Sequence, residues 1–167
     1  MHKSSRIAIT LALTAGLGAL ALAAPLARAE DDTAQAAYAD IERTLGLVPG
    51  FFKAFPASGI AGAWAEFKSV QLNPRTKLDG KTKELIGLAV AAQIPCRYCI
   101  YFHTAAARAN GASDEEIREA VAMAAISRHW STVLNGMQID EAAFQHETDT
   151  VLKLAGDKAK AASAKAQ

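Results

Sequence analysis

Several features are scarce in this sequence. Acidic and basic residues nearly cancel, at 17 and 18 in 167 residues, and no basic patch with interleaved aromatic side chains occurs, which argues against nucleic acid as a partner. No internal repeat, glycine-rich phosphate loop or Ser-His-Asp order is found. Runs of β-branched residues are few, and 51% of the residues are hydrophobic, many of them alanine. This composition and length predict one all-α domain.

Only two cysteines occur, and they stand three positions apart, at Cys96 and Cys99. With Glu84 before them and His103 after them, two thiols, a carboxylate and an imidazole fall within twenty residues of helical sequence. On a helix the two cysteines are neighbours on one face, and their sulfurs can form a disulfide with little backbone movement. His103 lies one turn further along the same face. The spacing therefore predicts a chemical site.

The position of this helix adds to the reactivity of the thiols. Pro95 breaks the chain, so the helix opens at about Cys96, where unpaired backbone N–H groups and the positive end of the dipole favour a thiolate. The imidazole of His103 can take or return the proton of Cys99, and Glu84 can orient that imidazole or pass the proton on. The residues thus predict a reactive thiol with a proton relay and a second thiol that resolves the product.

Two other interpretations of the cysteine pair stay open. A purely structural disulfide is possible, although a bridge closing so small a loop constrains little chain entropy. Cys96, Cys99 and His103 could instead be metal ligands, but the usual fourth ligand is not evident. Haem attachment through C-x-x-C-H is excluded, because residue 100 is isoleucine. We therefore expect neither a metal nor another cofactor.

The spacing of Glu84, Cys96, Cys99 and His103 resembles the Glu-x11-Cys-x2-Cys-x3-His pattern of the alkylhydroperoxidase D-like proteins, within the carboxymuconolactone decarboxylase superfamily. The resemblance covers about residues 45 to 150. It implies a compact all-helical domain with the C-x-x-C at a helix start, assembly into homo-trimers or homo-hexamers, and thiol-dependent reduction of hydroperoxides. It also implies that Cys99 attacks the peroxide, Cys96 resolves it to a disulfide, and Glu84 and His103 carry protons.

The sequence departs from this family in two respects. Peroxidase-type members often have a histidine between the cysteines where this chain has Tyr98, whose hydroxyl is a possible substitute in the relay. The well-known members also work in the cytoplasm, whereas this chain has the marks of export. The decarboxylases of the superfamily generally lack the cysteine pair, so lactone decarboxylation is not expected.

Residues 1–29 resemble a signal peptide. A basic start is followed by an uncharged apolar run from Ile7 to Leu22 and by the small-x-small pattern at residues 27–29. We expect cleavage after Ala29, an exported and periplasmic protein, and no stable membrane span after cleavage; a retained anchor is the alternative. Cleavage removes three basic and no acidic residues, which changes the formal charge from +1 to −2.

The remaining chain divides into a helical domain, residues 30–156, and a flexible Ala/Lys tail, residues 157–167. Caps, breakers and apolar spacing predict the helices of the domain. Their expected bounds are 31–46, with Asp31 or Asp32 as the cap, about 59–72, 80–93, 96–110, 114–125, 127–134, and a last helix capped by Asp140. The apolar residues of 85–92 lie nearly all round their helix, which favours an oligomer.

Three functions fit these residues. The first is a peroxidase that uses a hydroperoxide as substrate and a thiol or dithiol of unknown identity as reductant. The second is an extracytoplasmic dithiol-disulfide oxidoreductase acting on protein thiols, since an oxidising compartment favours the disulfide. The third is a non-catalytic helical assembly module whose cysteines are merely bridged.

Overall fold

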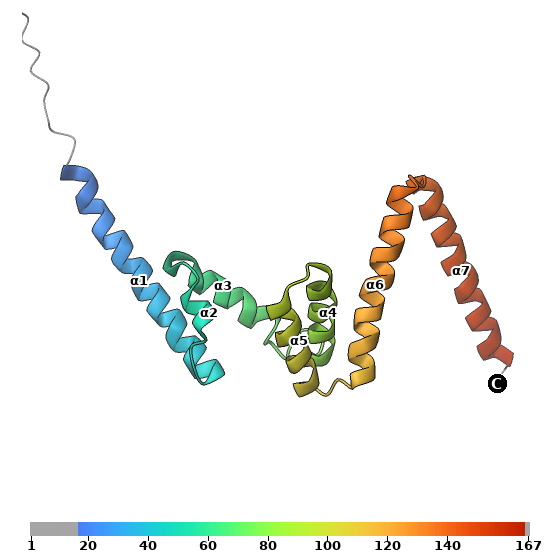
Figure 1. Ribbon diagram of the computed structural model, residues 1–167, viewed down its shortest axis with the longest axis horizontal. Coiled ribbons are helices and arrows are strands. Elements are labelled where there is room, and N and C mark those ends of the chain that lie inside the picture. The colour runs from blue at the N-terminus through green and yellow to red at the C-terminus, as the bar shows by residue number, and fades with distance from the viewer. Residues whose placement is uncertain (1–16, 166–167) are drawn as a thin grey trace, which may run out of the picture. The chain divides into compact units, whose positions relative to one another are not determined.

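The structure is a computed structural model that describes the backbone of residues 17–165 and the side chains of residues 31–165. All regular structure in this part of the chain is helical, which confirms the predicted all-α class (Figure 1). Seven helices occur there: α1 Leu17–Leu45, α2 Gly50–Lys53, α3 Ala57–Val70, α4 Gly80–Gln93, α5 Arg97–Ala109, α6 Asp114–Gly136 and α7 Glu141–Lys165.

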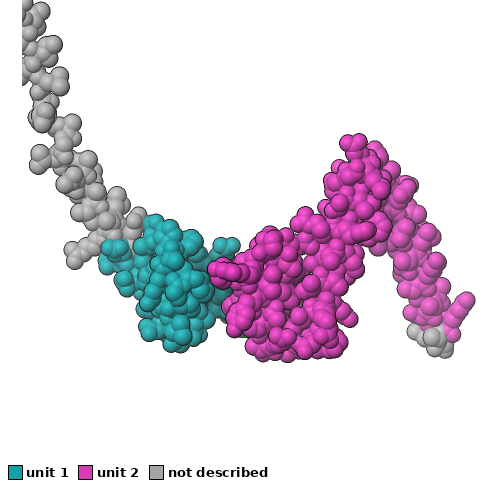
Figure 2. Space-filling view, in the orientation of Figure 1, with its two compact units in different colours: residues 1–77 teal, residues 78–167 magenta. Residues whose placement is uncertain are grey.

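Figure 2 shows two compact units, residues 1–77 and residues 78–167. In the first unit, α1 packs on α3, and Phe52 of α2 completes the core. Phe52 meets Trp64 edge to face, with the ring centroids 5.6 Å apart. The indole Nε1 of Trp64 donates to Oδ2 of Asp40 at 2.6 Å. A hydrogen bond from Lys68, followed by that of Trp64, holds the pKa of the Asp40 carboxyl below its usual range.

The second unit is built around α4, which packs against both α5 and α6. Leu88 of α4 is buried against Ala107 of α5 and Ile117 of α6. One face of α4 therefore supplies the core, and the same face carries Glu84, a buried carboxylate that is 5% exposed. The opposite face, with Ile86 and Val90, is about half exposed in the single chain.

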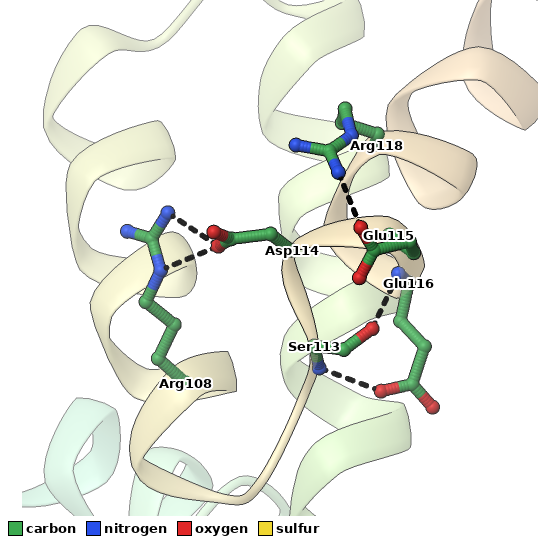
Figure 3. A network of polar contacts seen from close by, with 6 residues as sticks. All are labelled: Arg108, Ser113, Asp114, Glu115, Glu116 and Arg118. Carbon is green, nitrogen blue, oxygen red and sulfur yellow. Dashed lines mark hydrogen bonds and ion pairs between the residues drawn. The ribbon is translucent and has the colours of Figure 1, made fainter.

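The starts of α4 and α6, close to the expected residues, are fixed by side-chain caps, of which the sequence predicted the one at Ser113–Glu116. Asp79 caps α4 by accepting from the backbone N–H of Thr82 at 2.7 Å, and this hydrogen bond lowers the pKa of the Asp79 carboxyl. At the start of α6, Oγ of Ser113 accepts from the N–H of Glu116, while the carboxylate of Glu116 accepts from the N–H of Ser113 (Figure 3). Both caps satisfy donors that a helix end leaves unpaired.

The capping box at the start of α6 contributes to the stability of the fold. Ser113→Ala removes the acceptor for the N–H of Glu116, so we expect the free energy of unfolding to fall by about 1 kcal/mol. Urea denaturation followed by circular dichroism measures this. Ser127→Ala is the matched control, because its hydroxyl only donates to the carbonyl of Met123 within the same helix. Equal unfolding midpoints for the two variants would contradict the role of the cap.

Two predicted boundaries are wrong. The first helix does not begin at Asp31 or Asp32, because α1 is continuous from Leu17. Residues 127–134 do not form a separate helix but belong to α6, and no glycine or proline interrupts the sequence before Gly136. Residues 157–165 are helical and exposed in the structure, and the flexibility expected of this tail stays a prediction. Alanine and lysine favour helix even where no core lies beneath them.

The predicted signal peptide, residues 1–29, falls partly outside the described residues, and its cleavage stays a prediction. None of the described helices combines the length and the hydropathy that a membrane-spanning helix needs.

Candidate active site

The cysteine pair lies at the start of α5, as the sequence predicted. Cys96 is the N-cap residue, and its Sγ accepts a hydrogen bond from the backbone N–H of Cys99 at 3.2 Å. The two residues form a disulfide, with their Cα atoms 5.3 Å apart, and both are half-buried. A sulfur at this position receives a helix N–H as a capping oxygen would, so the reduced form of Cys96 gains stabilisation as a thiolate.

The carboxylate and the imidazole come together across two helices. Oε2 of Glu84 on α4 lies 2.7 Å from Nδ1 of His103 on α5, and the two side chains are 6% and 19% exposed. An ionised carboxylate only accepts, so Nδ1 then carries the ring proton and Nε2 is the ring atom that can accept another. Burial of Glu84 is compatible with a charge because this hydrogen bond compensates part of the cost of desolvation.

The order of the residues on α5 relates this pair to the sulfurs. Cys99 and His103 are four residues apart in one uninterrupted helix, so they lie one turn apart on the same face, with a rise of about 6 Å between them. The structure thus brings together Glu84 and His103 by a hydrogen bond and Cys96 and Cys99 by a covalent bond. These are the four residues that the sequence predicted as a site.

Tyr98, the possible substitute in the relay, has a different partner. Its hydroxyl accepts from Nη2 of Arg97 at 3.2 Å, and the guanidinium lies 5.0 Å from the centroid of the tyrosine ring. The tyrosine is 73% exposed. The hydrogen bond that the structure gives Tyr98 therefore joins it to the solvent-facing Arg97 and not to the buried Glu84.

Sequence reasoning missed Gly87, which touches the imidazole. A Cβ built on Gly87 would lie 2.5 Å from Nδ1 and 2.8 Å from Nε2 of His103, well inside van der Waals contact. One feature of the sequence could have indicated Gly87. A glycine interrupts the apolar residues of α4 three positions after Glu84, on the helical turn that follows the carboxylate.

A metal site was one alternative for Cys96, Cys99 and His103. Among the side chains of residues 31–165, no group of three or more His, Cys, Asp or Glu residues is arranged so that it could hold a metal ion. In the structure the two sulfurs are bonded to each other and Nδ1 of the imidazole faces Glu84.

The fold and the site define an all-helical protein with a C-x-x-C disulfide at a helix start and, one helical turn along, a partly buried histidine bonded to a buried glutamate. The profile of the Carboxymuconolactone decarboxylase family matches residues 59–142, so the chain belongs to this family. Within that superfamily it is an alkylhydroperoxidase D-like protein.

Two proteins are similar to this chain, and the first of them supports the assignment. The crystal structure of the alkylhydroperoxidase AhpD core from Rhodospirillum rubrum is 30% identical and superposes with a TM-score of 0.59, over 68% of this chain and 87% of that one. An uncharacterized protein 4 in the cox locus of Paracoccus denitrificans is 47% identical over 51 residues. That match covers 30% of this chain and 46% of the relative, which is less than half of its length.

Proposed function

We propose that this protein is a thiol-dependent peroxidase that reduces hydroperoxides through a dithiol-disulfide cycle of Cys96 and Cys99. The observation that carries the proposal is the Glu84–His103 hydrogen bond, one helical turn from a cysteine pair that can close a disulfide. A purely structural bridge has no need of a buried carboxylate and an imidazole beside it. The alkylhydroperoxidase-like fold adds support.

The cycle balances in two steps. The thiolate of Cys99 attacks the terminal oxygen of the hydroperoxide, the O–O bond breaks, and the products are an alcohol and a sulfenic acid on Cys99. The thiol of Cys96 then attacks the sulfenic sulfur, forming the disulfide and releasing water. Two electrons from an external thiol or dithiol reductant restore both thiols. Neither step needs a metal or an organic cofactor.

The Glu84–His103 pair moves the protons of this cycle. Nε2 of His103 takes the thiol proton of Cys99 and returns it to the departing alkoxide. The imidazolium formed in between carries a positive charge, which the carboxylate of Glu84 stabilises through Nδ1–H. The helix start favours a thiolate at Cys96 in the second step.

The stoichiometry of a single turnover tests the proposal. The fully reduced protein, mixed with cumene hydroperoxide, should consume about one equivalent, lose both thiols and become about 2 Da lighter. A variant with Cys96→Ser and Cys99→Ser is the control and should consume none. If the reduced protein left the hydroperoxide intact while its disulfide oxidised a protein dithiol, the oxidoreductase alternative would replace the peroxidase.

Export is a further part of the proposal, supported by the signal-like residues 1–29. In the periplasm an oxidising environment favours the disulfide, so a peroxidase there depends on a dedicated reductant. The identity of that reductant is defined by chemistry alone: it must deliver two electrons to a half-buried disulfide at a helix start.

We also propose a homo-trimer or homo-hexamer. Ile86 and Val90 on α4, followed at the same four-residue spacing by Ile94 at the C-cap of that helix, form a stripe and are 49%, 54% and 62% exposed in the single chain. On α6, Ile126 and Trp130 are 50% and 54% exposed. Complete burial of a large exposed apolar side chain contributes about 1.5–3 kcal/mol, and the exposed half of each of these side chains corresponds to about half of that. A second copy of the same chain that covers several of them would therefore be stabilised.

Light scattering of the purified protein at micromolar concentration should give the mass of three or six chains. Val90→Glu places a charge in the α4 stripe and should shift the mass towards one chain, because an unpaired buried charge is costly. Lys160→Glu, at an exposed position of α7 without large apolar neighbours, is the control and should leave the mass unchanged. A monomeric parent protein would refute the assembly.

A further inference from the structure

Three helical glycines lie so close to a side chain that a Cβ would clash with it: Gly59 against Phe55, Gly80 against Asn110 and Gly87 against His103. Gly59 and Gly80 stand in the first turn of their helices, and of the three only Gly87 meets a residue of the candidate site. Gly62 lies inside α3 and Gly156 inside α7, and a Cβ added at either would meet no atom within 4 Å. At Gly87 the added Cβ would fall within 3 Å of three atoms of the imidazole. The His103 ring therefore occupies the space that a side chain at position 87 would need.

The backbone itself does not require glycine at this position. Gly87 lies in the middle of α4 and does not have the positive φ that favours glycine elsewhere in the chain, as at Gly46 and Gly111. Glycine inside a helix is less favourable than alanine, since it has more conformational freedom to lose. The missing Cβ is the remaining reason on structural grounds.

The location of Gly87 connects it to the proton relay. It follows Glu84 by three residues, so its Cα lies on the turn next to the carboxylate. The imidazole sits against that turn with Nδ1 directed at Oε2 of Glu84, and the ring of Phe102 meets it edge on, with centroids 5.3 Å apart. Moving the ring away from Gly87 moves Nδ1 away from the carboxylate.

We propose that Gly87 is a positioning residue of the relay: its lack of a side chain admits the His103 imidazole to the surface of α4 and thereby allows the hydrogen bond to Glu84. This inference rests on the proposed peroxidase function only for its effect on rate. The effect on the imidazole itself is independent of what the site does.

The protonation pattern of the imidazole is the first test. In the full-length protein labelled with ¹⁵N, long-range proton–nitrogen spectra should show His103 of the parent with its proton on Nδ1 when the ring is neutral. Gly87→Ala should weaken or abolish that pattern, as Glu84→Gln should. Gly156→Ala should preserve it. An unchanged Nδ1–H pattern in Gly87→Ala would overturn the proposal.

The free energy of unfolding gives a second test. The direction in which Gly87→Ala changes it should depend on whether the imidazole of His103 is present. In the parent background, Gly87→Ala should lower the urea midpoint or raise it less than Gly156→Ala does, because the clash opposes the gain in helix propensity. In the His103→Ala background no ring stands in the way, so Gly87→Ala should raise the midpoint. The same shift in both backgrounds would show that Gly87 does not act through His103.

The rate at which the reduced protein consumes hydroperoxide gives the third test of the proposal. Gly87→Ala should slow it about tenfold or more, and Gly156→Ala should leave it within about twofold of the parent. In the His103→Ala background, Gly87→Ala should change it by less than about twofold, since the group it positions is gone. A full tenfold loss in that background would contradict the proposal. If no variant, the parent included, consumed hydroperoxide while the spectra and midpoints behaved as expected, the peroxidase function would fail and the positioning role of Gly87 would stand.

Discussion

Replacing Cys99 with serine is expected to slow hydroperoxide consumption by the reduced protein on the order of a thousandfold. A serine hydroxyl is not ionised at neutral pH, whereas the thiol of Cys99 stands one helical turn from the imidazole that takes its proton. Stopped-flow mixing of the reduced protein with cumene hydroperoxide measures the rate of the first step.

The matched variant is Cys96→Ser, which removes the resolving thiol but keeps the attacking one. It should retain a first step close to the parent in rate and stop with one oxidised cysteine. Both variants keep a side chain of similar size at the start of α5, so a difference between them reports chemistry and not folding. Peroxide consumption by Cys99→Ser at the parent rate would refute the assignment of Cys99.

Removing the imidazole is the second large effect. His103→Ala should lower the rate of the first step about a hundredfold, within the range that general acid-base catalysis contributes. Glu84→Gln keeps the shape of the buried side chain but loses its charge, so it should lower the rate by about tenfold. The two losses should not add, because the carboxylate acts through the imidazole.

Another histidine serves as the control for this effect. His129 lies on α6 with its ring edge on to Trp130, at a centroid distance of 5.3 Å, and is exposed. His129→Ala should leave the rate within about twofold of the parent. A hundredfold loss in His129→Ala, or none in His103→Ala, would show that the proton leaves Cys99 by another route.

The helix ends that the sequence predicted correctly depend on local interactions. Asp79 and Ser113 cap helices through hydrogen bonds that reach three residues along the chain. Gly46 and Gly111 end helices with φ of +84° and +83°, which glycine adopts readily. Such signals are complete within a few residues and need no knowledge of the rest of the fold.

The wrong boundaries lie where residue types that often cap helices stand inside a continuous helix, as Asp31 and Asp32 do in α1 and Ser127 does in α6. No glycine or proline breaks the chain at Ser127, and the helix continues there. The apolar spacing of α6 changes because its first part packs on α4 while later residues such as Met123 and Trp130 are exposed in the single chain. Periodicity alone cannot separate a change of neighbours from a change of helix.

The part of the site that lies on a single helix was predictable from the spacing of residues along the sequence. Two residues on one helix, such as Cys99 and His103, have their relative positions fixed by helix geometry. Glu84 lies on a different helix, and its hydrogen bond to His103 was expected from the resemblance and from the chemistry of a buried carboxylate. Gly87 was not predicted, because its role depends on how α5 packs against α4, and residue spacing along the chain does not show that packing.

Trapping of the sulfenic acid with dimedone tests the central claim most directly. The claim is that Cys99, with its proton removed by the Glu84–His103 pair, reduces a hydroperoxide. Reduced Cys96→Ser, given one equivalent of cumene hydroperoxide, should gain a single dimedone adduct that peptide mass spectrometry locates on Cys99. Absence of that adduct, or an adduct that forms equally fast on Cys96 in the Cys99→Ser protein, would contradict the account.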